Sequence, residues 1–286
     1  MKILTAPFVA LVSALVLSGC ALLPAQTSSA PGTQPAPSSP SRASGEVKSL
    51  LWVGNSFYYY NNSMHGHVSR LLTAAGGKGF RASSATISGS GLNWHDVGAH
   101  LRADNGVGSY SFVGDNEVRF NPKGAKKFDA VMMMDCSQCP VHPDLKPLFH
   151  EFVGKHSATA RSFGTEPILF MSWAYSDMPE MTEPLAAEYV KAGKAHNALV
   201  VPAGLAFAAS VKKRPDVSLI VADKRHPSLA GTYLGACIVM ASVYKMNPVG
   251  NKYTAGLPAD VAAHLQAVAW ETAQTFHAKE GRGSLR

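Results

Sequence analysis

Short apolar runs alternate with longer amphipathic stretches along most of this 286-residue chain, and this alternation constrains the fold more than any other feature. Five of the runs have the length of strands: 50–53, 80–87, 130–134, 168–171 and 199–201. Helix-length stretches lie between and after them, at 62–75, 143–163, 184–197, 203–213, 228–246 and 257–279. Strands that alternate with helices favour a mostly parallel sheet covered by helices on both faces. We therefore expect a three-layer α/β/α domain.

One segment interrupts this order. Residues 109–113 and 117–120 are short strand-like runs, and Gly114-Asp115-Asn116 between them is a turn sequence. We expect a small β-hairpin inserted before the third strand of the sheet.

The N-terminus has the pattern of a targeting segment. Lys2 precedes an apolar run over 3–17, which is too short to span a bilayer comfortably. The run ends in Leu17-Ser18-Gly19-Cys20, which resembles the lipobox of bacterial lipoproteins. The resemblance implies that residues 1–19 are a signal peptide and that Cys20 becomes the lipidated first residue. Ala21 resembles an outer-membrane sorting signal, which implies an anchor facing the periplasm or the cell surface; the alternative is an ordinary secretory peptide.

Residues 20–46 are rich in Pro, Ser and Ala, and they cannot bury enough apolar area to fold. We expect a tether that holds a single domain, 47–282, off the membrane. Hydrophobic residues make up 46% of the chain, enough for a core. The net charge of +7 is scattered, which argues against nucleic acid as a partner.

Candidate functional residues follow the predicted strands. In parallel α/β sheets, sites lie beyond the carboxyl ends of the strands. The residues that fall on this predicted rim are Ser56, Gly89, Gly91, His95, the loop 135–139, Asp223 and His226.

Three of these segments resemble motifs of the SGNH/GDSL hydrolases. Gly54-Asn55-Ser56 resembles the first block of that family, in a Gly-Asn-Ser variant, and Asp223-x-x-His226-Pro227-Ser228 resembles the last. Gly89, in Gly-x-x-Leu-x-x-His, resembles the glycine of the second block. The resemblance implies a flavodoxin-like sheet and a serine esterase that works through an acyl-enzyme without a cofactor. Ser56 would be the nucleophile, His226 its base and Asp223 the carboxylate that orients the base.

These residue types suit the implied chemistry. A serine hydroxyl is a poor nucleophile unless a base takes its proton, and imidazole titrates in the range that this needs. A carboxylate fixes the tautomer of the imidazole. The chain has no Gly-x-Ser-x-Gly elbow, which argues against the α/β-hydrolase fold.

The set of groups that would donate hydrogen bonds to the oxyanion is harder to identify than the triad. We expect the backbone N–H groups of Ser56 and Gly89 to act. The family normally adds a side-chain amide after the third strand, but Met134 stands there. Gln138 is our expected third donor, with Asn93, or backbone donors alone, as alternatives.

Several other residues allow two interpretations. We expect Tyr58 and His95 to line the substrate site, although both could instead pack inside the domain. His65 and His67 at i and i+2 point apart on a helix, so no metal site is expected. Cys136 and Cys139 could form a short disulfide or stay free thiols.

Two function classes follow. The first is an esterase that removes an acyl or acetyl group from an envelope carbohydrate, or cleaves a small or lipid ester. The second is a non-catalytic lipoprotein that uses the same scaffold to bind glycan or lipid.

Overall fold

The computed structural model describes residues 47–106 and 108–281. The predicted signal peptide, the lipidated Cys20 and the tether therefore lie outside the described residues. Within the described ranges, no helix is both long enough and apolar enough to cross a membrane.

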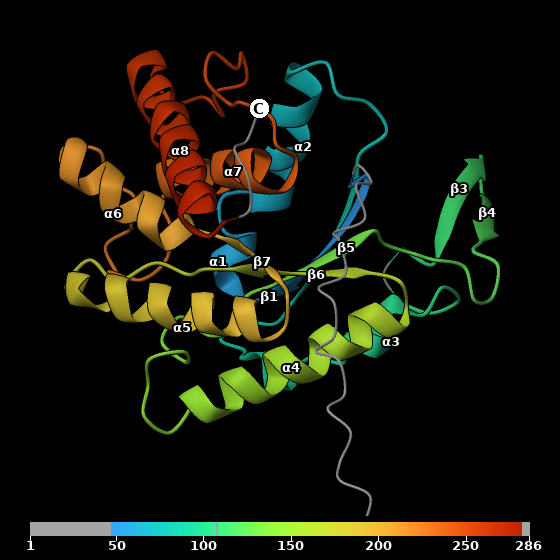
Figure 1. Ribbon diagram of the computed structural model, residues 1–286. Helices are drawn as coiled ribbons and strands as arrows, with labels where there is room; N and C mark the ends of the chain where they lie inside the picture. The colour runs from blue at the N-terminus through green and yellow to red at the C-terminus, as the bar shows by residue number, and fades with distance from the viewer. Residues whose placement is uncertain (1–46, 107, 282–286) are drawn as a thin grey trace, which may run out of the picture. The chain divides into compact units, whose positions relative to one another are not determined.

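A five-stranded sheet forms the centre of the domain (Figure 1), and all its neighbouring strands are parallel. Its strands are β1 (Ser49–Gly54), β2 (Arg81–Thr86), β5 (Ala130–Met133), β6 (Glu166–Phe170) and β7 (Leu199–Val201). Their spatial order is β2-β1-β5-β6-β7, which is the flavodoxin-like order. The predicted strands and the predicted sheet are confirmed.

The strands differ in burial, and the two edge strands, β2 and β7, are unlike each other in this respect. Every residue of β1, β5 and β7 is buried, as expected for strands covered on both faces. The edge strand β2 carries small and polar residues and is only partly buried.

Helices cover both faces of the sheet (Figure 1). The layer that contains α7 is made by α2 (Met64–Ala74), α6 (Ala203–Lys213), α7 (Leu229–Val243) and α8 (Ala259–Lys279). The opposite layer is made by α3 (Val97–Leu101), α4 (Lys146–Ser162) and α5 (Thr182–Ala195). Short helical turns add α1 (Ser56–Tyr59), η1 (Leu92–Trp94) and η2 (Pro179–Met181). The three-layer prediction is confirmed.

The central helix α7 is apolar on every side. All its residues from Ala230 to Val243 are buried, because the helix packs against α2, α6, α8 and β7. Its N-cap Ser228 accepts a hydrogen bond from the Gly231 N–H at 3.2 Å. The loop that precedes this cap is therefore fixed to the core.

The predicted hairpin is confirmed as β3 (Tyr110–Gly114) paired antiparallel with β4 (Glu117–Phe120). It projects away from the sheet (Figure 1). Tyr110 pairs with Phe120 and Phe112 with Val118, so four apolar side chains share one face, and all four are exposed.

Candidate active site

The turn after β1 presents Ser56 as the first residue of α1. Asn55 caps this helix, because its Oδ1 accepts the Phe57 N–H at 3.2 Å. Its Nδ2 donates to the carbonyl oxygens of Ser90 at 3.0 Å and Asp135 at 3.1 Å. A carboxylate could not donate to two carbonyls. The amide of Asn55 therefore ties the loops after β2 and β5 to the residue that precedes Ser56.

Ser56, His226 and Asp223 form a hydrogen-bonded series. Ser56 Oγ lies 2.8 Å from His226 Nε2. His226 Nδ1 lies 2.6 Å from Asp223 Oδ2. The other carboxylate oxygen, Asp223 Oδ1, accepts the backbone N–H groups of Arg225 at 2.8 Å and His226 at 2.9 Å. The fold thus brings together the three residues that the sequence singled out.

The surroundings of Asp223 keep it ionised. Desolvation acts to raise the pKa of Asp223, but the two backbone N–H groups and the His226 imidazole outweigh it and lower the pKa to about 2. An ionised carboxylate at Nδ1 favours the imidazole tautomer with a proton on Nδ1. The lone pair of Nε2 is then directed to the Ser56 hydroxyl.

The loop that carries Asp223 and His226 is closed on itself. The Val221 N–H donates to the His226 carbonyl and the Ser228 N–H to that of Leu219, both at 2.9 Å. Asn61, in the turn after α1, holds the same loop, because its Nδ2 donates to the Pro227 carbonyl at 2.9 Å. The nucleophile segment and the base are therefore connected directly.

Aromatic rings fix the plane of the imidazole. The Tyr60 ring stacks on His226 with centroids 4.3 Å apart and planes 8° apart. The edge of His226 meets Phe57 at 5.4 Å, and Phe57 stacks on Trp173 at 4.6 Å. The Trp173 indole donates to the Arg225 carbonyl at 3.1 Å. Sequence reasoning missed Trp173, which follows β6 without any motif.

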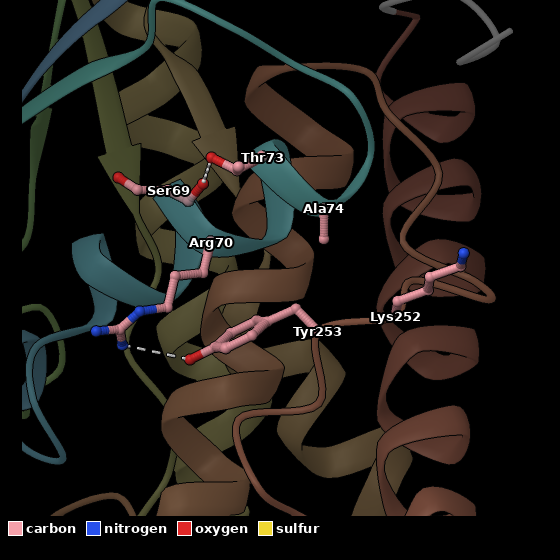
Figure 2. Close-up of a pocket in the computed structure, with 6 residues that line it drawn as sticks. All are labelled: Ser69, Arg70, Thr73, Ala74, Lys252 and Tyr253. Carbon is pink, nitrogen blue, oxygen red and sulfur yellow. Dashed lines mark hydrogen bonds between the residues drawn. The ribbon is translucent and has the colours of Figure 1, made fainter.

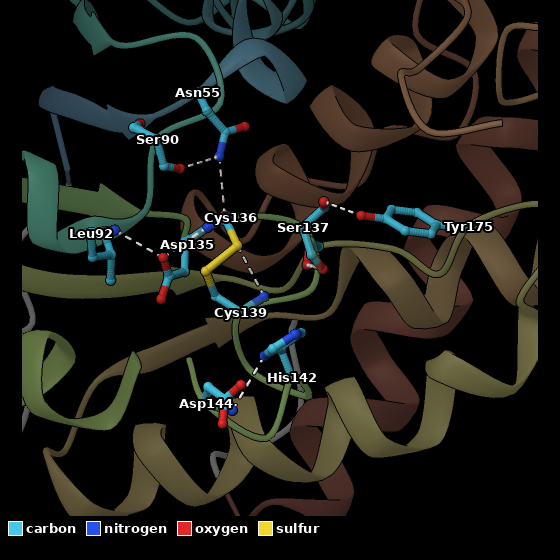
Figure 3. The surroundings of a disulfide bond; sticks show 11 residues. Asn55, Ser90, Leu92, Asp135, Cys136, Ser137, Cys139, His142, Asp144 and Tyr175 are labelled. Atoms are coloured by element: carbon cyan, nitrogen blue, oxygen red, sulfur yellow. Dashed lines mark hydrogen bonds between the residues drawn. A yellow bond between two sulfur atoms is a disulfide. The ribbon is translucent and has the colours of Figure 1, made fainter. Parts of the chain in front are cut away.

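A second set of contacts joins the base loop to the loop after β5. The Arg225 guanidinium lies 3.7 Å from the centre of the Tyr175 ring and pairs with Asp177. The Tyr175 hydroxyl lies 2.6 Å from Ser137 Oγ (Figure 3). Ser137 sits between Cys136 and Cys139, which form a disulfide bond. Of the two interpretations of these cysteines, the disulfide is confirmed.

A cavity of about 220 Å³ opens beside this disulfide. Its wall includes Gly89, Gly91, Asn93, Trp94 and Asp135, together with both cysteines, Leu145 and Leu148. Because Asn55 is bonded to the backbone of Ser90 and Asp135, the cavity is built on the same backbone that holds the Ser56 turn.

Neither a protein-family model nor a curated protein matches the chain. Solved structures do. A putative SGNH hydrolase from Slackia heliotrinireducens is 21% identical, with a TM-score of 0.52, over 68% of this chain and 97% of that one. The chain has the fold of the SGNH hydrolases. TesA is similar at 17% identity and a TM-score of 0.50, over 68% and 97% of the two chains. A DUF4886 family protein from Bacteroides uniformis covers 82% of this chain and 96% of its own, at 15% identity and a TM-score of 0.57.

Within this SGNH fold, Gly89 has a φ of 70°, in the left-handed region that favours glycine. Gln138 lies in the disulfide loop with an exposed side chain. Asn93, and not Gln138, is among the described residues that line the cavity beside Gly89. The placement favours Asn93 as the third oxyanion donor, and the role of either amide stays a prediction.

Two predicted lining residues are in the interior of the SGNH fold. Tyr58 is fully buried between Trp52 and Phe170, with ring centroids 4.9 and 5.2 Å away. Burial raises the pKa of Tyr58 well above its usual value. The expectation that it lines the substrate site is wrong, because Tyr58 lies on the side of α1 that faces the sheet.

His95 is also buried, and its Nε2 lies 2.9 Å from Ser90 Oγ. Desolvation lowers the pKa of His95 to about 4, so the ring is neutral. It supports the loop after β2 from inside, and the prediction that it lines the site is wrong.

A larger cavity, of about 410 Å³, lies on α2 (Figure 2). It is lined by Ser69, Arg70, Thr73, Ala74, Lys252 and Tyr253, so no member of the Ser56 series takes part. The hydroxyl groups of Ser69 and Thr73 donate to helix carbonyls. Nearby, the two ring nitrogens of His67 lie 2.7 Å from the Tyr253 hydroxyl and the Asn61 carbonyl, so these contacts already occupy both nitrogens.

Proposed function

We propose that this protein is a serine esterase with Ser56 as its nucleophile. The observation that carries the proposal is the continuous hydrogen-bonded series from Ser56 through His226 to Asp223. Nucleophile, base and orienting carboxylate within hydrogen-bond reach of one another are the arrangement that ester hydrolysis needs. The likeness to a putative SGNH hydrolase supports the same assignment.

In the first half-reaction, Ser56 Oγ bonds to the ester carbonyl carbon while its proton moves to His226 Nε2. The carbonyl oxygen becomes an oxyanion, which the N–H groups of Ser56 and Gly89 stabilise; each such donor contributes roughly 2.7–4 kcal/mol. The C–O bond to the alcohol then breaks, and the alcohol leaves with the proton from His226. The acyl group remains on Ser56.

In the second half-reaction, a water molecule gives a proton to His226 Nε2 and its oxygen attacks the acyl carbon. The bond to Ser56 Oγ breaks, the carboxylic acid leaves, and Ser56 recovers its proton from His226. Asp223 stays ionised throughout and stabilises the imidazolium.

For the substrate, we propose an acyl or acetyl ester of an envelope carbohydrate, or a small or lipid ester. This class follows from the proposed location, in which Cys20 carries the lipid anchor and the domain 47–282 acts in the cell envelope.

The test is turnover of p-nitrophenyl acetate, together with covalent labelling by diethyl p-nitrophenyl phosphate. Ser56→Ala and His226→Ala should each lower kcat by about 10³-fold or more, and the label should appear on the Ser56 peptide of the wild type only. Ser111→Ala, on the exposed hairpin, is the matched control and should retain full activity.

Full activity in the Ser56→Ala protein would refute the proposal. A folded wild type with neither turnover nor label would instead favour the non-catalytic scaffold.

A further inference from the structure

The cavity beside Gly89 holds a carboxyl group that the esterase chemistry does not use. Asp135 is only 3% exposed. Its Oδ1 accepts the N–H groups of Leu92 and Cys136, both at 2.8 Å. In the part of the chain that the structure describes, both hydrogen bonds to this carboxyl group go to Oδ1, and none goes to Oδ2. Within the described residues, no Lys, Arg or His side chain forms an ion pair with Asp135, so this buried acid has no counterion from the protein.

A second acceptor lies next to this carboxyl. Gly91 has a φ of −92°, so its backbone conformation does not require glycine. A Cβ atom there would lie 2.7 Å from Asn93 Oδ1 and 2.8 Å from Asp135 Oδ1. A side chain at Gly91 would therefore collide with both acceptor oxygens, so the wall of the cavity at this point consists of the Gly91 backbone and the side chains of Asn93 and Asp135.

The rest of the wall suits a compact cation on a carbon chain. Trp94 lines the cavity and is 61% exposed, and Leu145 and Leu148 add apolar surface. The face of an indole ring attracts cations, more strongly where water is excluded. Burial raises the pKa of Asp135 to about 6, against the opposing effect of its two backbone N–H partners. A bound cation would offset this desolvation.

We propose that this cavity is a subsite for the ammonium group of a cationic ester, with Asp135 as the counterion and Trp94 as the aromatic wall. The proposal rests on the proposed esterase function, because the cavity starts at Gly89, the candidate oxyanion glycine. The substrate class is thereby narrowed to esters with an ammonium group close to the carbonyl, in the acyl half or in the alcohol half.

The test compares matched esters that differ only in this charge. Glycine ethyl ester and ethyl propanoate place the ammonium group or its neutral isostere in the acyl half. Acetylcholine and 3,3-dimethylbutyl acetate place a quaternary ammonium group or its neutral isostere in the alcohol half. For each pair, the ratio of kcat/KM for the charged ester to kcat/KM for the neutral ester is measured in wild type and in Asp135→Asn. Intrinsic ester reactivity cancels when the two ratios are compared.

We expect Asp135→Asn to lower the ratio about tenfold or more in one of the pairs, as for loss of a hydrogen bond to a charged group. The pair that responds identifies the half of the ester that enters the cavity. Trp94→Leu, at an exposed position, should lower the same ratio by a smaller factor, and it serves if Asp135→Asn does not fold. Asp144→Asn removes an exposed acid from the same segment between β5 and α4, and it should leave both ratios unchanged.

Ratios that stay the same in Asp135→Asn and in Trp94→Leu would overturn the subsite. The neutral esters report the esterase separately, since their hydrolysis requires the proposed Ser56, His226 and Asp223 series but no cation in the cavity. If Ser56→Ala hydrolyses them as fast as wild type, the proposed function fails. Calorimetry of ethylammonium chloride and choline chloride with wild type and Asp135→Asn then still decides the subsite: weaker binding by the variant supports it, and equal binding overturns it.

Discussion

Asp135 is a residue that the fold holds at a cost in stability. Its carboxyl group is buried beside the disulfide, and two backbone N–H groups only partly offset the lost hydration. Asn55 illustrates the opposite case, because every polar atom of its amide has a partner. Asn55 donates a hydrogen bond to the Asp135 carbonyl, so a fully hydrogen-bonded amide lies next to a carboxyl group with hydrogen bonds to only one of its oxygens.

A pH dependence of stability follows from Asp135. Its pKa is about 6 in the folded protein and 3.8 without burial. Between these values the folded state holds a proton that the unfolded state has lost, so the free energy of unfolding falls as the pH rises through this window. The loss is roughly 3 kcal/mol at most. Asp135→Asn keeps an oxygen acceptor for Leu92 and Cys136, and should therefore be more stable than wild type near neutral pH.

The measurement is chemical denaturation of wild type and variant from about pH 4 to about pH 8, where the difference between them should grow with pH. Asp144→Asn makes the same change in charge at an exposed position and should show no such trend. A constant difference between Asp135→Asn and wild type across the range would contradict the assignment.

Among the elements, α7 and the loop before it depend on each other. A Cβ at Gly231 would collide with the Leu219 carbonyl oxygen and come within 3.2 Å of Phe207. Leu219 begins the loop that ends in His226 and Ser228. The close approach of α7 therefore helps to set the position of His226, the proposed base.

Gly231→Ala should push α7 away from this loop. We expect a loss of about 1–3 kcal/mol in unfolding free energy, together with lower kcat for p-nitrophenyl acetate. Thermal unfolding and turnover would be measured on the same preparation. Gly66→Ala is the control, because Gly66 also lies in a helix but has open space around it. That variant should be as stable as wild type or more so, and an equal loss in both variants would mean that the packing argument is wrong.

The sequence predicted the long elements because their hydrophobic periodicity is strong, and it singled out Ser56, Asp223 and His226 because the segments around them resemble SGNH/GDSL motifs. It missed α3 and the short turns, which are too brief to show a period. It misplaced Tyr58 because the direction of one side chain within a single helical turn depends on packing. The sequence placed Asp135 on the predicted rim without assigning it a role, and it missed Trp173, whose partners Phe57 and Arg225 are distant in the chain.

At the scale of the whole chain, we predict separate roles for the domain and its N-terminal segment. We predict that Cys20 carries the lipid and that Cys20→Ser abolishes membrane attachment, leaving a released protein or an uncleaved precursor. Mass spectrometry and membrane fractionation after expression in a bacterium would test this. Ser56→Ala should fractionate as wild type does. A wild type that retains Met1, or that has an unmodified Cys20 thiol, would rule the anchor out.

The interior position of β1 in the sheet has a consequence for how the protein folds. β1 pairs with β2 on one side and with β5 on the other, and Ser56 at its end meets His226 across 170 residues of chain. Contacts of such long sequence separation form slowly. During synthesis, Ser56 leaves the ribosome long before His226 is added to the chain. In such an incomplete chain, the Ser56 hydroxyl has no base to accept its proton. Under the proposed function, activity would appear only when α7 docks, and the recovery of activity during refolding would time that final step.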